Sequence, residues 1–266
     1  MAIKLFVTDL DGTLLNRRHE ISEANRRAVK AAVARGVVAT IATGRMYASA
    51  LPYAKRLEVD VPIITYNGAL IKSVAGDVWF EKYLAPDAVA DVYALCRQRG
   101  WYVQTYKDDA LYFAERDVRA HRYEVAAGIK GQAVGGALYK MTEGVPKMLL
   151  ITEGSAQSDA FVEVIQETLG VRVFATKSNP EYIEIVHPDV NKAAALTVLM
   201  ERLGLTKDEV LAIGDSNNDL PMLKAAGTSV AMGNASEAIR ALCTDVTADC
   251  DEDGVAKAIE KHILRR

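Results

Sequence analysis

Residues 3–15 read Ile3-Lys4-Leu5-Phe6-Val7-Thr8-Asp9-Leu10-Asp11-Gly12-Thr13-Leu14-Leu15. The run from Ile3 to Thr8 predicts a buried strand, because apolar runs of this length are typical of strands covered on both faces. Two acids follow it, and Gly12 allows the chain to leave the strand sharply. An α/β sheet binds ligands at the carboxyl ends of its strands, so Asp9 and Asp11 stand where a site is expected. An Asp-Gly turn is the alternative that this stretch alone leaves open.

The composition is that of a soluble globular protein. The chain has 266 residues, of which 50% are hydrophobic and 25% charged, and this length suits one large domain or two ordinary ones. The formal net charge is -3 and the sequence pI is about 5.9. Such a chain lacks the broad positive field that attracts a polyanion regardless of sequence. We therefore expect no nucleic acid partner.

Cysteine usage and hydrophobic runs favour a reducing compartment. Cys96, Cys243 and Cys250 are widely separated and show neither zinc-ligand nor redox spacing. The apolar run 3–7 is too short for the hydrophobic region of a signal peptide, and no later run approaches the ~20 residues that cross a bilayer. We expect a cytoplasmic protein without a membrane partner.

The first third of the chain alternates strand-like and helix-like segments. Ser22 can cap a helix that Gly36 ends, and a strand follows at 37–42. A second helix to about Leu57 and a strand at 63–66 continue the pattern. This order predicts a doubly wound, mostly parallel, Rossmann-like sheet with helices on both faces.

The pattern changes near Leu84, where Pro86 can open a helix, and it resumes at Asn191-Lys192. Two similar α-β-β halves lie between, which predicts an inserted α+β domain. The expected organisation is a discontinuous core over 1–83 and 188–266 and an insert over 84–187. Within the insert we expect strands at 102–106, 111–114, 147–152, 171–175 and 182–186 and a helix at 155–169.

A second acidic segment follows a later predicted strand, 210–213. It reads Gly214-Asp215-Ser216-Asn217-Asn218-Asp219 and precedes a helix-like run. One Asp or Asn would cap that helix, whereas five polar side chains exceed what capping requires. If both strands are central and parallel, the acids converge, and close carboxylates must take up protons or bind a cation. An all-oxygen cluster suits Mg²⁺ rather than zinc. The expected acids are Asp9, Asp11, Asp215 and Asp219.

Other polar residues suit a phosphate ester bound beside that metal. Thr43 and Gly44 lie between the second strand and a helix, where a hydroxyl and backbone amides can meet an anion. Lys192 could supply a positive charge to the same phosphoryl group. Taken singly, a threonine-glycine turn and one lysine are ordinary surface features.

The four segments, in this order, resemble the Cof-type phosphatases of the haloacid dehalogenase-like superfamily, and the resemblance covers essentially the whole chain. The motifs are Asp9 to Leu15, Ala42-Thr43-Gly44-Arg45, Lys192, and Gly214 to Asp219. Ala193 departs from the family pattern, in which glycine often follows the lysine. The insert resembles the type IIB α+β cap of that family. Smaller resemblances are Asn67-Gly68-Ala69, Met232-Gly233-Asn234-Ala235 and Asp251-Glu252-Asp253-Gly254-Val255.

The resemblance implies a role for each matching residue. Asp9 would be nucleophile and metal ligand, and Asp11 would be general acid/base and a ligand through its backbone carbonyl. Asp215 would be the third protein ligand, with Asp219 supporting the metal from close by. Lys192 would be catalytic and would also hold phosphoryl oxygens. The remaining phosphate- or substrate-binding residues would be Leu10, Thr43, Gly44 and Asn218, with Arg45 and Asn67 near the entrance for the rest of the substrate.

The predicted activity is hydrolysis of a small phosphomonoester, such as a sugar phosphate or related phosphometabolite, through an aspartyl-phosphate on Asp9. A phosphotransferase or phosphomutase uses the same intermediate and is the nearest alternative. A phospho-accepting signalling module needs only one small domain, and its acids follow a different order. A catalytically silent binding protein would require substituted catalytic positions, and none is seen. The sequence leaves the physiological substrate and the oligomeric state open.

Overall fold

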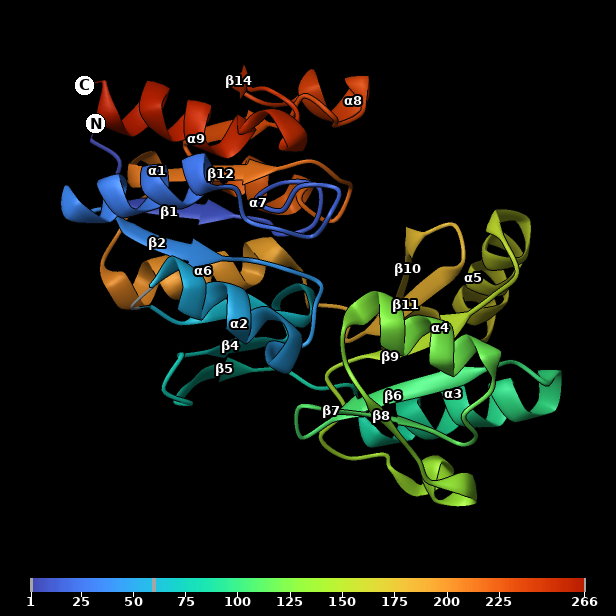
Figure 1. The fold of residues 1–266 in the computed structure, drawn as a ribbon. Helices are drawn as coiled ribbons and strands as arrows, with labels where there is room; N and C mark the ends of the chain where they lie inside the picture. The colour runs from blue at the N-terminus through green and yellow to red at the C-terminus, as the bar shows by residue number, and fades with distance from the viewer. Residues whose placement is uncertain (1, 59–60, 266) are drawn as a thin grey trace. The chain divides into compact units, whose positions relative to one another are not determined.

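The computed structural model describes residues 2–58 and 61–265 (Figure 1). The chain divides into two compact units. The core unit comprises Met1–Gly44, Ala50–Phe80 and Asn191–Arg266, and the inserted unit comprises Arg45–Ser49 and Glu81–Val190. An α/β core with a separate α+β unit confirms the predicted fold class.

The core unit is built on a five-stranded parallel sheet. Its order is β14-β13-β12-β1-β2, which places β1 between β2 and β12. Thr8, the last residue of β1, aligns with Ile41 on one side and Ile213 on the other. The residues that follow these strands therefore leave the sheet at one edge. The strands are β1 (Leu5–Thr8), β2 (Val38–Ile41), β12 (Val210–Gly214), β13 (Thr228–Ala231) and β14 (Asp245–Val246).

Helices cover both faces of this sheet (Figure 1). On one face α6 (Lys192–Leu203) lies beside α7 (Leu220–Ala225), and their apolar side chains pack on Leu5, Val7 and Ala212. On the other, α1 (Glu23–Ala34) contacts α9 (Gly254–Ile259), and Ser22 caps α1 through the amide of Asn25. Each fully buried Leu, Val or Ile contributes about 1.5–3 kcal/mol relative to exposure.

Further helical segments belong to the core unit, although residues 47–49, at the start of the first of them, group with the inserted unit. They are α2 (Tyr47–Leu57), α8 (Glu237–Arg240), the 3₁₀ turns Tyr66–Gly68, Lys207–Glu209 and Cys250–Glu252, and a π-helical turn at Glu260–Leu264.

A three-stranded sheet, β3-β4-β5, was only partly anticipated. We expected one strand at 63–66, whereas the chain forms β3 (Ile63–Thr65) and then β4 (Leu70–Lys72) and β5 (Val78–Glu81). The turn between β4 and β5 forms because the Ser73 hydroxyl oxygen accepts the amides of Gly76 and Asp77. Strands this short carry too little periodicity to be recognised in the sequence.

The inserted unit has a six-stranded sheet in the order β10-β11-β9-β6-β7-β8. Helices α3 (Pro86–Arg99) and α5 (Ser155–Leu169) pack on one face around Val103, Leu150 and Ile183. On the opposite face Tyr123 of α4 (Val118–Ala127) contacts Tyr106 and Tyr182. The strands are β6 (Val103–Lys107), β7 (Ala110–Phe113), β8 (Gly131–Ala133), β9 (Met148–Ile151), β10 (Phe174–Asn179) and β11 (Tyr182–Val186).

The two α-β-β halves are α3-β6-β7 and α5-β10-β11, with α4, β8, a 3₁₀ turn at Gly135–Lys140 and β9 between them. The strand expected at 171–175 was misplaced. Residues Gly170–Arg172 form a 3₁₀ turn because α5 ends at Gly170, whose φ is 55°, and β10 starts only at Phe174.

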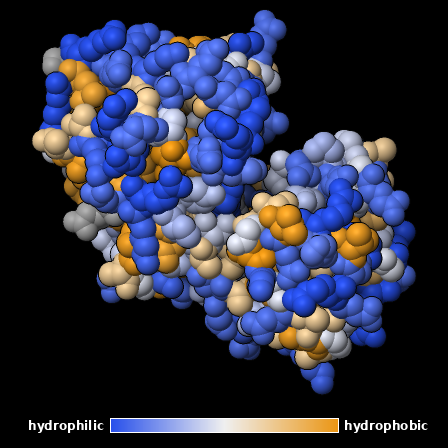
Figure 2. Space-filling view, viewed as in Figure 1, coloured by the Kyte–Doolittle hydropathy of each residue, from blue (hydrophilic) through white to orange (hydrophobic). Residues whose placement is uncertain are grey.

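The surface visible in Figure 2 is mostly hydrophilic, with small separate apolar patches. Within the described part of the chain, no helix is long and apolar enough to cross a membrane.

Gly68 fixes how the turn after β3 packs against the start of α6. Its φ is 110°, and a Cβ there would lie 2.4 Å from the backbone oxygen of Asn191. Gly76 has nearly the same φ, 108°, but open space around it.

Replacing each glycine by alanine separates backbone strain from steric clash. Gly76→Ala should lower the free energy of unfolding by about 1–3 kcal/mol through strain alone. Gly68→Ala should lower the free energy of unfolding by about a further 1–3 kcal/mol, because its methyl group would clash with the backbone oxygen of Asn191. Urea denaturation measures both. Equal losses would show that the contact with Asn191 relaxes freely.

Candidate active site

Asp9 and Lys192 form the centre of the site. Asp9 follows β1, is only 5% exposed, and donates its amide to the Ile213 carbonyl at 3.0 Å. Lys192 is the first residue of α6 and is fully buried. Its Nζ lies 2.6 Å from Oδ1 of Asp9 and 2.6 Å from Oδ1 of Asp219. One ammonium group therefore holds two carboxylates that come from different strand ends.

Asp219 precedes α7, but its side chain makes no capping hydrogen bond to that helix. Instead Oδ2 accepts the amides of Asp215 and Ser216, each at 3.0 Å. The carboxylate thus folds back over the loop that follows β12. Gly214 makes this possible, because a Cβ there would lie 2.6 Å from Cβ of Asp219. Helix capping does not account for this acidic segment.

Asp215 is held on both carboxylate oxygens. Oδ1 accepts the Thr13 hydroxyl at 3.0 Å, and Oδ2 lies 3.4 Å from Nδ2 of Asn234. A Cβ on Gly12 would lie 2.6 Å from Oδ2, so the carboxylate rests against the Gly12 backbone. Gly12 therefore serves twice, since its φ of 74° also turns the chain away from β1.

These carboxylates form a buried group that a cation suits. Oxygens of Asp9, Asp215 and Asp219 all lie within 4.8 Å of one another. Burial raises the pKa of Asp9 well above its usual range, although Lys192 opposes the shift. Burial, reinforced by Asp219, raises the pKa of Asp215 to about 6. Lys192 supplies one positive charge to three carboxyl groups, and hard oxygen donors in this number could hold a divalent cation.

Asp11 lies at the edge of this group. Its side chain is 44% exposed, and its Oδ1 is 3.5 Å from Nδ1 of His19. The structure therefore brings together three of the four acids expected to converge and leaves the Asp11 carboxylate facing solvent. The Asp11 carboxyl group is therefore accessible to solvent, two residues along the chain from the buried Asp9.

Thr43, Gly44 and Asn67 lie together at the end of β2. The Thr43 amide donates to Ile64, and its carbonyl accepts the Asn67 amide at 3.0 Å. Gly44 packs against the Asn67 side chain, because a Cβ on Gly44 would lie 3.0 Å from Oδ1. That same Oδ1 accepts Nδ2 of Asn218 at 3.0 Å. Asn67 thus joins the loop after β2 to the loop after β12.

Leu10 and Arg45, both predicted to bind phosphate or substrate, offer fewer groups to a ligand. The Leu10 side chain is fully buried, and its carbonyl accepts the amides of Thr13 and Leu15, so only its backbone is available to a ligand. Arg45 is half-buried and donates to the Ser49 hydroxyl one turn along the chain.

Sequence reasoning missed the contacts of Thr13 and Asn234 with Asp215. Both residues fall in stretches singled out for resemblance, at 9–15 and 232–235, but no property of the stretches indicates what their side chains contact. The contact between Asn234 and Asp215 depends on β12 and β13 being adjacent in the sheet.

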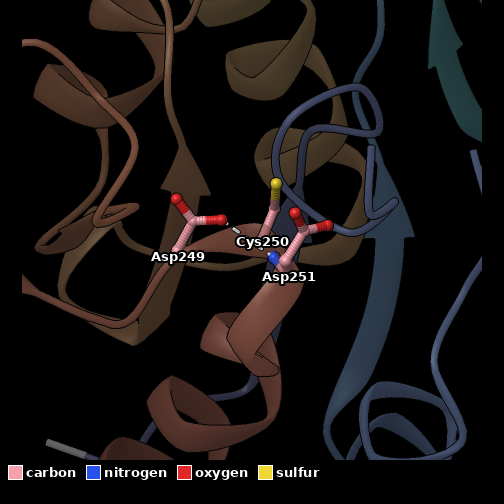
Figure 3. Close-up of side chains that lie close together, drawn as sticks. All are labelled: Asp249, Cys250 and Asp251. Carbon is pink, nitrogen blue, oxygen red and sulfur yellow. Dashed lines mark hydrogen bonds between the residues drawn. The ribbon is translucent and has the colours of Figure 1, made fainter. Parts of the chain in front are cut away.

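A second acidic group, Asp249-Cys250-Asp251, has two partly exposed carboxylates that share one guanidinium. Figure 3 shows the Asp249 carboxylate accepting the amide of Asp251. The Arg17 guanidinium pairs with Asp249 at 2.9 Å and also with Asp251. Arg17 holds the pKa of Asp251 below its usual range. This group anchors a loop and lacks the buried excess charge of the site at Asp9.

Comparisons with known proteins identify the family of this chain. Residues 6–259 match the family model of the haloacid dehalogenase-like hydrolases. A 5-amino-6-(5-phospho-D-ribitylamino)uracil phosphatase of Bacillus subtilis is 33% identical over 98% of this chain and 96% of its own. A haloacid dehalogenase-like hydrolase from Bacteroides thetaiotaomicron superposes with a TM-score of 0.90 at 31% identity, covering 97% and 99% of the two chains. A subclass IIB sugar phosphatase shares the fold, with a TM-score of 0.83 at 23% identity and coverage of 97% and 98%.

Removing the Lys192 ammonium should leave the buried carboxylates uncompensated. In chelator at pH 7, Lys192→Met should lower the free energy of unfolding by about 3–5 kcal/mol. The loss should shrink toward pH 5, because Asp9 and Asp215 have raised pKa values and take up protons as the pH falls. Chemical denaturation at both pH values measures this.

The control is Lys4→Met, which breaks the pair between Lys4, 61% exposed, and Glu209, 14% exposed. Because the Lys4 ammonium lies in solvent, its loss should lower the free energy of unfolding by only about 0–1 kcal/mol at either pH. A Lys192→Met protein as stable as the Lys4→Met protein would contradict the charge balance described here.

Proposed function

The chain belongs to the haloacid dehalogenase-like hydrolases and is a phosphatase of that family, and we propose that it hydrolyses small phosphomonoesters through an aspartyl-phosphate on Asp9. The observation that carries the proposal is the buried ammonium of Lys192, shared by Asp9 and Asp219 at 2.6 Å each. A carboxylate held this way at the carboxyl edge of a parallel sheet is fixed in direction and kept close to a positive charge.

We propose Mg²⁺ as the cofactor. Asp9, Asp215 and the backbone carbonyl of Asp11 would hold it, with Asp219 supporting it from close by. The three clustered carboxylates and their single ammonium favour a hard divalent cation. When bound, Mg²⁺ supplies charge that neutralises the phosphoryl oxygens.

The reaction would proceed by two in-line displacements. An Asp9 carboxylate oxygen attacks phosphorus while Asp11 donates its proton to the departing alcohol oxygen, which breaks the ester bond. Asp11 then removes a proton from water, and the water oxygen attacks the phosphorus of the aspartyl-phosphate, releasing phosphate and Asp9. The exposure of Asp11 supports its role, because its proton must reach both alcohol and water.

Lys192, Thr43, Gly44 and Asn218 would hold the phosphoryl oxygens, together with the backbone of Leu10. The hydrogen bond from Asn218 to Asn67 supports this set, because it holds the loop after β12 close to the turn after β3. Arg45 and Asn67 would contact the rest of the substrate.

We assign substrate selection to the insert at 84–187, as a type IIB cap. The substrate class would be sugar phosphates or related phosphometabolites, consistent with the ribityl phosphate named for the B. subtilis relative. We place the protein in the cytoplasm, where reducing conditions suit its free thiols at Cys96, Cys243 and Cys250.

A panel of phosphometabolites tests the activity directly. With Mg²⁺ the purified protein should release phosphate from at least one member, and chelator should reduce release to background. Asp9→Asn should lower the rate of phosphate release by about 10⁴-fold or more, because it removes the nucleophile. Near-normal rates in Asp9→Asn at saturating Mg²⁺ would refute the nucleophile.

The same panel separates hydrolysis from transfer. A phosphotransferase or mutase would yield an isomerised or newly phosphorylated product with little free phosphate. Absence of any turnover, with a lasting phosphoaspartate, would instead indicate a signalling module.

Asp11→Asn should distinguish acid/base chemistry from metal binding, since the backbone carbonyl is kept. Turnover of an alkyl phosphate should fall by about 10²–10⁴-fold. With p-nitrophenyl phosphate, whose leaving group needs no proton, a stoichiometric burst of nitrophenol should precede slow turnover. Equal losses on both substrates without a burst would assign Asp11 another role.

A further inference from the structure

Side chains link the loop after β1 to the segment before and within α9. Asn25 donates to the Leu14 carbonyl at 3.2 Å and accepts the Ala256 amide at 2.9 Å. Asn234 donates to the Gly12 carbonyl at 2.8 Å and accepts the Cys250 amide at 3.0 Å. Arg17 adds the ion pairs to the acids of Figure 3.

The two asparagines make the same kind of bridge. Each amide group donates to a carbonyl of the β1 loop and accepts an amide from the C-terminal segment. They differ in one respect: Nδ2 of Asn234 also lies 3.4 Å from Oδ2 of Asp215, whereas the side chain of Asn25 bonds the Leu14 carbonyl and the Ala256 amide, both backbone groups.

The Asn234 contact completes the support of Asp215. Thr13 holds Oδ1, the Gly12 backbone limits the position of Oδ2, and Asn234 holds both Oδ2 and the Gly12 carbonyl. If Asn234 is removed, Oδ2 loses its side-chain donor and the Gly12 peptide loses its anchor. The Asp215 carboxylate then keeps only the hydrogen bond from Thr13 to Oδ1, so it can rotate about its Cβ–Cγ bond.

We propose that Asn234 is a positioning residue that orients the Asp215 carboxylate for the metal ion. The inference rests on the proposed Mg²⁺ site and gives a role to the stretch at 232–235, which supplies the amide group that supports Asp215. The amide of Cys250, just before the stretch at 251–255, fixes the Asn234 amide group in turn.

Mg²⁺ binding to the whole chain without substrate tests this proposal. The rise in thermal midpoint with Mg²⁺ concentration gives the affinity, and isothermal calorimetry checks it. Asn234→Ala and the similarly sized Asn234→Leu should each bind Mg²⁺ about 10–100-fold more weakly than the unmodified protein, as expected when a residue supporting a metal ligand is removed. At saturating Mg²⁺, KM should change less than the Mg²⁺ affinity.

Asn25→Ala is the matched control. It breaks an equivalent bridge at a more buried residue, 1% exposed, so its thermal midpoint without Mg²⁺ should fall at least as far. Its Mg²⁺ affinity should stay within about twofold of the unmodified protein, because no carboxylate loses a donor.

The outcomes separate this inference from the proposed function. If the unmodified protein binds no Mg²⁺, the proposed metal site fails. If it binds Mg²⁺ and both Asn234 variants bind equally well, the positioning role fails. Equal weakening by the Asn234 variants and Asn25→Ala would also overturn it, since the effect would then come from general loosening of the loop.

Discussion

The site depends on one buried ammonium group. Lys192 lies at the start of α6, after the whole insert, and holds Asp9 from β1 and Asp219 from the loop after β12. Bringing these charges out of water costs several kcal/mol per ion, and the pair attraction alone barely offsets that cost. Such an arrangement therefore adds little to the stability of the fold. It is reasonable where carboxylates must be held close together and ready for a cation and a phosphate.

The site also requires the backbone to lie close to the carboxylates of Asp215 and Asp219. Gly12 and Gly214 each lie where a Cβ would be 2.6 Å from an acidic side chain, that of Asp215 and that of Asp219. The two glycines therefore let the acids from two neighbouring strands share a small volume. Any larger residue would push these carboxylates apart and so weaken the proposed Mg²⁺ site.

The environment of each acid suits a different task. Asp9 is buried, ion-paired and fixed, which suits a nucleophile that must approach phosphorus along one line. Asp11 is exposed and beside His19, which suits a group that exchanges protons. Asp215 is held by neutral donors, which suits a metal ligand that keeps its charge and direction. The three acids thus differ in burial, ion pairing and exposure, and the roles proposed for them follow these differences.

The sequence by itself determined the fold class, the position of both acidic segments at strand ends, and the N-cap at Ser22. These follow from local patterns, since the period of apolar residues and the residues that end strands act over a few positions. The β4–β5 hairpin was not predicted, because its strands are too short to show a periodic pattern of apolar residues. Only the tertiary structure decided which acids meet, because the pairing of β1 with β12 brings Asp9 near Asp219. Lys192, 183 positions from Asp9, reaches both where α6 packs on the sheet. The tertiary structure likewise decided that Asp11 faces solvent and that Asn234 reaches Asp215. Side-chain direction and distance depend on how loops from neighbouring strands pack, and no local pattern encodes that packing.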